Sequence, residues 1–342
     1  MIWMRADGNP EIGIGHIMRC VSIADEIKQM GEEVCFILAD ECASELLQQK
    51  GYRYIVLHTA YDCMESEIDV LKQLIEQHKP DLLVVDSYSV TKHYFEEIND
   101  IVKTAYMDDL GDNSYPVNIL INYNVYATDE MYGQAKDCVG RFLLGAQYAP
   151  LRDEFRTNGC AVAKDVRNVF ISTGGSDKYN LAGMMLDFFM QDEELKMLNY
   201  HVICGNFNVH EKELEQKANK FTNINLYKNV SNIAEIMKRC DLAISAAGST
   251  LYELAALSIP SIIFSFADNQ KKPTEAFGFC GAAVSVGHYE ADDKGAFMRS
   301  MMKTIKKVCA DYDERQEMAH NANRLVDGLG AGRIARAIVE CK

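Results

Sequence analysis

Residues 1–38, MIWMRADGNPEIGIGHIMRCVSIADEIKQMGEEVCFIL, predict a strand, a glycine-containing turn, a helix and a second strand. The helix is expected over 16–30, where apolar residues recur at helical spacing on one face: Ile17, Val21, Ala24 and Ile27. Gly31 marks its end, as glycine often does after a helix. A strand, a helix and another strand in succession form the unit from which parallel sheets are built.

The rest of the chain repeats this alternation of short apolar strands and helical segments. It predicts an α/β fold with doubly wound, Rossmann-like parallel sheets that carry helices on both faces. The stretch 148–168 interrupts the rhythm, and a new set of strands begins at RNVFIS. We therefore expect an N-terminal domain over 1–150, a linker over 151–167, a second domain over 168–325 and a cleft between the domains. A terminal helix over 326–342 could cross back to the first domain.

The composition is that of a globular protein with a strongly acidic balance. Of the 342 residues, 48% are hydrophobic and 25% are charged, and the formal net charge is −15. This charge argues against a dedicated nucleic-acid binder, which needs a basic face. The eleven cysteines form no Cys-x-x-Cys pair, which favours reduced thiols. No apolar run approaches the ~20 residues that span a bilayer, and no signal core is present, so we expect a cytoplasmic protein without membrane insertion.

The stretch EIGIGHIMRC, residues 11–20, places a histidine at the start of the predicted helix. Gly13 and Gly15 let the preceding turn pass close to a ligand. The positive end of the helix disfavours a charged imidazole, so His16 is a candidate base. A histidine bonded only to backbone is the structural alternative, and Arg19, one turn later, could face the same ligand or form an ion pair. A dinucleotide fingerprint is disfavoured, because the third small residue is missing.

Two loops of the second half resemble phosphate-binding turns. In FISTGGSD, Gly174 and Gly175 follow an apolar strand, so backbone N–H groups are accessible to an anion. In ISAAGSTLYELAA, small residues lead into a helix near Thr250, whose first turn offers unpaired N–H donors. Glu253 would lie in that turn and could bind a ribose diol. The alternatives are a plain tight turn and a capping glutamate, but a nucleotide diphosphate could bridge both loops.

Several motifs occur with the order and spacing of a known family: RADGNPEIGIGHIMRC, VVDSYSV, NYNVYA, YAPLRDEF, FISTGGSD, ISAAGSTLYELA and FSFADNQ. Together they resemble the UDP-2,4-diacetamido-2,4,6-trideoxy-β-L-altropyranose hydrolases of pseudaminic acid biosynthesis, whose relatives include spore-coat polysaccharide proteins. More distantly, the second half is similar to the UDP-binding domain of the N-acetylglucosaminyltransferase of peptidoglycan synthesis. The resemblance covers about 4–285 and implies the glycosyltransferase-B architecture. Ser87 stands where the family often has histidine.

The resemblance implies hydrolysis at the anomeric carbon without a metal or cofactor: water attacks C1, the configuration inverts and UDP leaves. It assigns catalysis to His16 as the base, to Tyr88 as its aromatic partner and to Asp7 as the acid of the first strand. It places Gly174, Gly175, Ser249, Thr250 and Glu253 at the nucleotide, and Asn269 and Gln270 near the sugar or the diphosphate. The further residues that we expect to bind substrate are Gly13, Gly15, Arg19, Asn122, Asn124, Arg152, Asn180 and Gly248. From the residues alone, Tyr88 with the two asparagines of NYN could form an amide-lined pocket for acetamido groups.

Two other functions remain open at this point. A UDP-sugar glycosyltransferase would share the fold and the donor site but would hold a hydroxyl-bearing acceptor instead of water. A non-catalytic nucleotide-sugar-binding protein would have no reason to present His16 to the ligand. The expected partner is in each case a small UDP-sugar, and the sequence does not indicate an oligomeric state.

Overall fold

The structure is a computed structural model that describes residues 1–111, 115–133, 137–157, 159–205 and 207–342. The chain forms two compact units. The first contains Met1–Asp153 together with Leu329–Lys342, and the second contains Glu154–Gly328. Most of the segment expected as a linker, 151–167, therefore lies within the second unit.

The first unit is built on a seven-stranded parallel sheet. Its strands are β1 (Ile2–Ala6), β2 (Val34–Leu38), β3 (Arg53–Val56), β4 (Leu82–Asp86), β5 (Lys103–Met107), β6 (Val117–Asn122) and β7 (Val139–Leu144). Its α-helices are α1 (Gly15–Gln29), α2 (Ser44–Gln49), α3 (Ile68–His78), α4 (Lys92–Asn99) and α12 (Gly330–Cys341). The strand, helix and strand predicted over 1–38 are confirmed, with the helix one residue earlier than expected.

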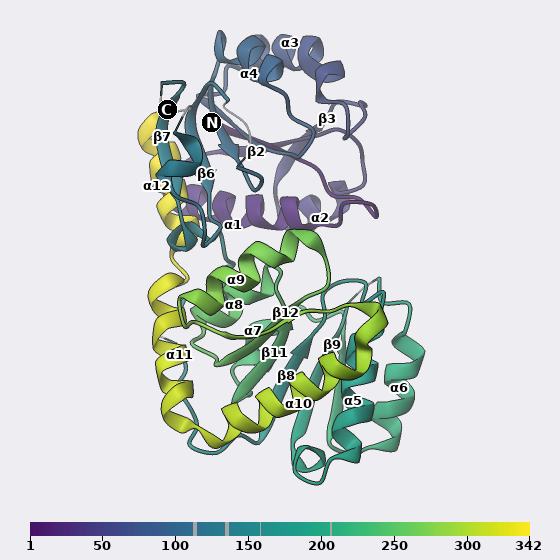
Figure 1. The fold of residues 1–342 in the computed structure, drawn as a ribbon. Coiled ribbons are helices and arrows are strands. Elements are labelled where there is room, and N and C mark those ends of the chain that lie inside the picture. The colour runs from purple at the N-terminus through teal and green to yellow at the C-terminus, as the bar shows by residue number, and fades with distance from the viewer. Residues whose placement is uncertain (112–114, 134–136, 158, 206) are drawn as a thin grey trace. The chain divides into compact units, whose positions relative to one another are not determined.

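Helices cover both faces of this sheet (Figure 1). Alternate residues of β1 point to opposite faces, as the pleat requires. Ile2 and Met4 pack in one core with residues of α1 and α12, whereas Trp3 packs in a second core with residues of α3 and α4. Every residue of β1 and β4 is buried, which is typical of central strands in a parallel sheet.

The strand order of the first sheet is β3-β2-β1-β4-β5-β6-β7. The chain therefore winds outward from β1 in one direction and, after crossing to β4, in the other. Between these two neighbouring strands lies the topological switch point, where the following loops separate and leave room for a ligand. The residues after β1 and at the end of β4 thus meet at the place where a doubly wound sheet binds its substrate.

The second unit repeats the plan with six parallel strands in the order β10-β9-β8-β11-β12-β13. The strands are β8 (Asn168–Ser172), β9 (Asn199–Cys204), β10 (Ile224–Lys228), β11 (Leu242–Ala246), β12 (Ser261–Ser265) and β13 (Val284–His288). The α-helices are α5 (Leu181–Gln191), α6 (Glu211–Lys220), α7 (Ile233–Met237), α8 (Thr250–Ala256), α9 (Lys271–Phe279), α10 (Lys294–Ala310) and α11 (Tyr312–Leu325). The switch point lies between β8 and β11, whose following loops carry the two predicted phosphate turns.

The last helix, α12, lies against α1 in the first unit (Figure 1). Ile334 and Ile338 are fully buried in the same core as Ile23 and Ile27 of α1. Gly330 fits at its start because a Cβ there would lie 2.2 Å from the carbonyl oxygen of Ala149. None of the helices in the described ranges is long and apolar enough to cross a membrane.

We expect Ile334→Ala to destabilise the first unit by about 2–5 kcal/mol, because it leaves a cavity between α12 and α1. Arg336→Ala is the matched control on the exposed side of the same helix. Urea denaturation followed by circular dichroism measures both changes. Equal denaturation midpoints for the two variants would contradict the docking of α12 on this core.

Candidate functional site

The loop after β1 is closed by backbone hydrogen bonds between Asn9 and Gly13, and α1 begins directly after it, at the switch point. The backbone N–H of Asn9 donates to the carbonyl of Gly13 over 3.2 Å, and that of Gly13 donates to the carbonyl of Asn9 over 2.8 Å. The Asn9 side-chain oxygen accepts from the amides of Glu11 and Ile12. Gly13 has a φ of +75°, which favours glycine. His16 therefore enters α1 from a well-defined loop.

His16 lies beside the last residue of β4. Its Nδ1 is 2.6 Å from Oδ1 of Asp86, and its side chain is 8% exposed. Asp86 reaches this place because β4 is the neighbour of β1 and pairs Asp86 with Ala6. A carboxylate only accepts hydrogen bonds, so the hydrogen lies on Nδ1 and the lone pair of the neutral ring on Nε2. This is the tautomer that a general base of this kind needs.

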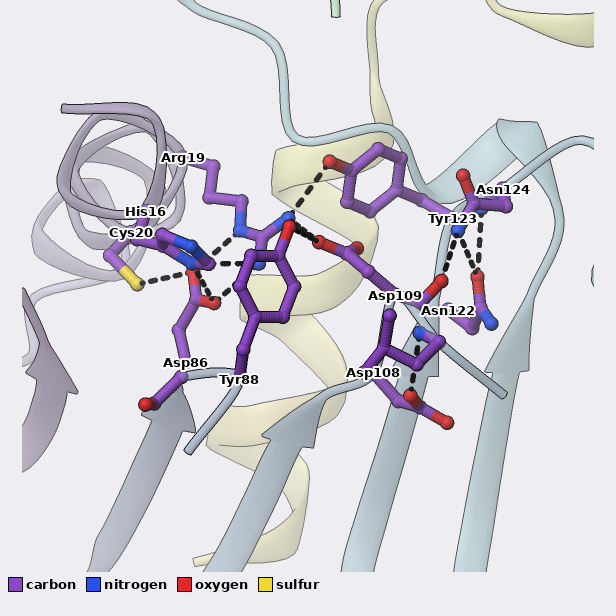
Figure 2. Close-up of polar contacts among 12 residues, drawn as sticks. His16, Arg19, Cys20, Asp86, Tyr88, Asp108, Asp109, Asn122, Tyr123 and Asn124 are labelled. Atoms are coloured by element: carbon purple, nitrogen blue, oxygen red, sulfur yellow. Dashed lines mark hydrogen bonds and ion pairs between the residues drawn. The ribbon is translucent and has the colours of Figure 1, made fainter. Parts of the chain in front are cut away.

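Arg19 lies one turn after His16 and binds the same carboxylate (Figure 2). Its Nε donates to Oδ2 of Asp86 over 2.5 Å, and its Nη2 donates to Oδ1 of Asp86. Its Nη1 donates to Asp109 over 2.6 Å and to the Tyr123 hydroxyl over 2.9 Å. The guanidinium thus joins the ends of three adjacent strands, β4, β5 and β6.

The charge on Asp86 is stabilised although the side chain is fully buried. Burial alone would raise its pKa, but attraction to Arg19 and the Arg19 hydrogen bonds, followed by His16, hold the pKa well below its usual range. The Cys20 thiol, 3.5 Å from Oδ2, donates to the same carboxylate. Burial and then the charge of Asp86 raise the pKa of that thiol, which remains protonated.

Tyr88 lies at the solvent-exposed edge of this cluster. Its ring meets the His16 ring edge-on, with centroids 4.6 Å apart and an interplanar angle of 78°. Its hydroxyl donates to Oδ2 of Asp109 over 3.0 Å, and the residue is 54% exposed. Figure 2 shows the ring between His16 and Asp109. The structure therefore brings together His16, Tyr88 and Arg19 of the predicted site.

The two asparagines of the predicted acetamido pocket make hydrogen bonds within the fold. Asn122 donates to the Tyr132 hydroxyl over 2.8 Å, and its side-chain oxygen accepts from the backbone and the side chain of Asn124. Tyr132 donates in turn to Asp108 over 2.7 Å, and Asn124 donates to the carbonyl of Asp109 over 3.2 Å. Both asparagines are buried. They hold the segment that carries Asp109, so their binding role stays a prediction.

Asp7, the first-strand acid that the resemblance assigns to catalysis, lies in a different buried network. Its two oxygens accept from Nη1 of Arg5 and from the amide of Ala39. The same arginine makes two bonds to Glu67, which also accepts from the Tyr94 hydroxyl. These bonds give Asp7 a structural part in holding β1 and β2, and the carboxylate beside His16 is that of Asp86. The catalytic role of Asp7 stays a prediction.

In the second unit, the loop after β8 exposes Gly174 and Gly175. Gly174 has a φ of +84°, and the Gly175 carbonyl accepts from the amide of Phe207 over 3.1 Å. A Cβ on Gly205 would lie 2.3 Å from that carbonyl oxygen, so the loops after β8 and β9 pack backbone against backbone. The glycine turn is thus held firmly with its outer side open.

The helix that follows this loop, α5, is capped by the protein itself. The buried Asp177 carboxylate accepts from the amides of Leu181 and Ala182 over 2.7 and 3.0 Å. Burial raises the pKa of Asp177, and these backbone bonds oppose the increase. Asn180, a predicted ligand, donates to Glu213 over 2.7 Å. An anion at this loop would therefore meet the glycine backbone rather than the first amides of α5.

The loop after β11 is arranged differently. Gly248 and Ser249 are exposed, and within the described ranges no side chain caps α8. Thr250 begins the helix and Glu253 lies in its first turn, as the sequence predicts. Small residues and an uncapped helix start at the switch point of the second sheet are the features of an anion-binding turn.

The remaining predicted ligands are placed as follows. Gln270, in the 3-10 turn Asp268–Gln270 after β12, accepts from the amide of Phe266 over 3.0 Å, and Asn269 beside it is exposed. Arg152 lies half-buried before the turn Asp153–Phe155. Gly15 begins α1 next to His16. The binding roles of these residues remain predictions.

Four members of the cluster are not among the site residues predicted from the sequence: Cys20, Asp86, Asp109 and Tyr123. Asp86 and Asp109 stand at the polar ends of the apolar stretches LLVVD and AYMDD, and this position is the available signal. Their pairing with His16 and Arg19 depends on which strands are neighbours. The sequence pattern does not reveal that order, because β1 and β4 are separated by two other strands along the chain.

Comparison with known proteins gives several relatives. Residues 169–331 match the glycosyltransferase family 28 C-terminal domain. The spore coat polysaccharide biosynthesis protein SpsG of Bacillus subtilis is 24% identical over 340 residues, which cover 96% of this chain and 95% of that protein. The UDP-2,4-diacetamido-2,4,6-trideoxy-beta-L-altropyranose hydrolase of Campylobacter jejuni is 25% identical over 272 residues, 79% of this chain and 93% of that protein. The uncharacterized protein MJ1062 of Methanocaldococcus jannaschii is 27% identical over 75% of this chain, but the match spans only 54% of that protein.

Two solved structures share the fold. MurG of Acinetobacter baumannii has a TM-score of 0.68 and 14% identity, with 99% of each chain covered. The UDP-GlcNAc 2-epimerase of Neisseria meningitidis bound to UDP-GlcNAc has a TM-score of 0.65 and 11% identity, covering 99% of this chain and 100% of that one. The predicted glycosyltransferase-B fold of two Rossmann-like units is confirmed. The hydrolase-named and SpsG relatives confirm the resemblance seen in the sequence motifs.

We expect Asp86→Asn to lower the free energy of unfolding by about 3 kcal/mol at pH 7, because it removes a buried partner of Arg19. The pKa of Asp86 is lowered in the folded state. Its stabilisation is therefore full above the unfolded pKa of about 3.9 and is lost as the pH falls towards the folded pKa. Urea denaturation at pH 7 and pH 3.5 measures the free energy of unfolding of both proteins, and the difference between wild type and variant should be smaller at pH 3.5. A difference that is equal or larger at pH 3.5 would contradict the lowered pKa of Asp86. Asp62→Asn is the exposed control.

Proposed function

We propose, from the glycosyltransferase-B fold and the likeness to proteins named UDP-2,4-diacetamido-2,4,6-trideoxy-beta-L-altropyranose hydrolase, that this chain is a UDP-sugar hydrolase. The proposed substrate is a UDP-linked 2,4-diacetamido-2,4,6-trideoxyhexose of nonulosonic (pseudaminic) acid biosynthesis. Water replaces UDP at the anomeric carbon with inversion. The observation that carries the proposal is the His16–Asp86 pair at the switch point of the first sheet.

His16 is the proposed base. Asp86 accepts the hydrogen of Nδ1, and no hydrogen bond from a described residue engages Nε2. A water bonded to Nε2 loses its proton to the ring as its oxygen forms the bond to C1. The bond between C1 and the diphosphate oxygen breaks, and its electron pair leaves with UDP. An oxocarbenium-like C1 needs a well-placed water more than a strong base, and the proton passes from His16 to solvent.

The second unit is the proposed nucleotide site. The loops after β8 and β11 flank its switch point, where doubly wound sheets bind nucleotides. We place the diphosphate at the backbone of Gly174 and Gly175 and at the amides of Ser249 and Thr250. These donors stabilise the charge that develops on UDP as C1–O breaks. Glu253 accepts hydrogen bonds from the ribose hydroxyls.

A glycosyltransferase is the second candidate, favoured by the match of residues 169–331 to a glycosyltransferase family. The first unit also exposes Ile12, Ile14 and Leu110 on loops at the carboxyl end of its sheet, which an apolar acceptor could contact. Incubation with a panel of UDP-sugars in ¹⁸O-labelled water separates the two. Hydrolysis places the label in the free sugar without any acceptor. UDP release that requires an added acceptor would identify a transferase.

We expect His16→Asn to reduce kcat by at least about 100-fold, because general base catalysis contributes 10²–10⁴-fold. The dissociation constant for UDP should stay unchanged, since the nucleotide is held by the other unit. Turnover of a UDP-sugar followed by phosphorus NMR, with calorimetry for UDP binding, measures both. Turnover equal to that of the exposed control His320→Asn would refute the base assignment.

Glu253→Ala should show the opposite pattern. We expect about tenfold weaker UDP binding, which corresponds to the loss of a hydrogen bond of about 1.5 kcal/mol. Calorimetric titration of UDP into the variant and into Glu235→Ala, an exposed glutamate of the same unit, gives the comparison. An unchanged dissociation constant for Glu253→Ala would remove this residue from the ribose site.

A further inference from the structure

We propose that Arg19 is a positioning residue that lets Asp86 orient the His16 ring while keeping that ring uncharged. The inference rests on the proposed function, because a neutral ring is needed only if His16 takes a proton. It also reassigns Arg19, which the sequence placed among substrate ligands. Three features of the cluster support this role: the hydrogen bonds of Arg19, the charge of Asp86, and the short distance between Arg19 and His16.

All three nitrogens of the Arg19 guanidinium donate hydrogen bonds within the first unit. Nε and Nη2 donate to the two oxygens of Asp86, and Nη1 donates to Asp109 and Tyr123. Nη2 is also 3.0 Å from Nδ1 of His16. The Arg19 side chain is only 10% exposed. With all three nitrogens engaged inside the fold, the guanidinium is not available as a clamp for a phosphate or a sugar.

The Asp86 carboxylate is shared between His16 and Arg19. A buried aspartate 2.6 Å from an imidazole stabilises the charged imidazolium unless another cation compensates it. Arg19 supplies that compensation with a planar fork that matches both carboxylate oxygens. Asp86 then still accepts the Nδ1 hydrogen and fixes the ring. Its charge, however, is already balanced, so the ring gains little by taking a second proton.

Arg19 and His16 also lie close to each other. Both Nη2 and Nδ1 donate to Oδ1 of Asp86, which explains their separation of 3.0 Å. A positive charge on the ring would face the guanidinium at this distance, which is unfavourable. Arg19 therefore opposes the imidazolium directly as well as through Asp86.

The other titratable and charged groups around the ring do not reverse this balance. These groups are Asp86 and Tyr88 on β4 and the segment after it, Cys20 on α1, Asp109 after β5 and Tyr123 after β6. Burial and then Asp109 raise the pKa of Tyr123 to about 12, and burial also raises the pKa of the Cys20 thiol. Both groups are neutral at pH 7, and Asp109 is itself bound by Arg19 and Tyr88.

The test compares the protonation of His16 in wild type, Arg19→Met and Arg19→Lys. Proton–carbon NMR of histidine-labelled protein follows the His16 ring through a pH titration without substrate. We expect the midpoint for Arg19→Met to move up by at least about one pH unit, the size of effect that a neighbouring charge has. Arg19→Lys, which keeps one positive charge, should move it less. Arg53→Met, which removes an exposed arginine paired with Glu33, is the control and should not move it.

Circular dichroism establishes that each variant is folded, and Arg19→Lys provides a folded variant if Arg19→Met does not fold. An unmoved or lowered His16 midpoint in the folded variants would overturn the proposal. This readout needs no turnover, so it also decides the proposal if no UDP-sugar is hydrolysed. The absence of hydrolysis would then refute the proposed function, whereas the NMR titration of His16 would still decide the role of Arg19.

Where turnover is measurable, kinetics distinguish a positioning residue from a substrate ligand. The acidic limb of the kcat/KM profile should move to higher pH in Arg19→Met, with KM within about threefold of wild type on the alkaline side, because a shifted free-enzyme group changes that profile. A KM raised at every pH with an unmoved acidic limb would show that Arg19 binds substrate and would overturn the proposal.

Discussion

One buried carboxylate organises the first unit's site. Asp86, at the end of β4, accepts from His16 and Arg19 at once, and Arg19 continues to Asp109 and Tyr123. Removing any member of this hydrogen-bonded network leaves a buried donor or charge without its partner, which lowers the stability of the fold. The orientation of the histidine ring is therefore a consequence of the ion pair beneath it. The proposed chemistry depends on that orientation.

The same sheet topology serves two different purposes in the two units. Both sheets wind outward from a central strand pair, β1–β4 in the first and β8–β11 in the second. In the first unit the switch point brings His16 and Arg19 of α1 to titratable side chains at the ends of three strands, β4, β5 and β6. In the second it gathers glycine and small residues, whose backbone amides suit an anion. The cleavage proposed for this chain uses one element of each kind, a proton acceptor and an anion-binding turn.

Much of this organisation is predictable from the sequence, because periodicity depends on local spacing. The alternation of strands and helices predicts both parallel sheets, and the glycine turn before His16 predicts a functional histidine at a helix start. The partner of that histidine is not predictable in this way. Asp7 follows one apolar strand and Asp86 ends another, and only the pairing of β1 with β4 decides that Asp86 lies beside the ring while Asp7 binds Arg5. Likewise, the phosphate turn after β8 is visible in the sequence. The capping of α5 by Asp177 is not, because Asp177 accepts from amides four and five residues later, farther than the two or three residues of an ordinary N-cap.

Asp86 fixes the His16 ring with its hydrogen on Nδ1 and leaves Nε2 as the acceptor. Nitrogen NMR of histidine-labelled protein near neutral pH reads the two ring nitrogens of His16 separately and assigns the tautomer directly. We expect a protonated Nδ1 and an unprotonated Nε2. A hydrogen found on Nε2 of the neutral ring would contradict this expectation, because the nitrogen left to accept a proton would then be the one facing Asp86.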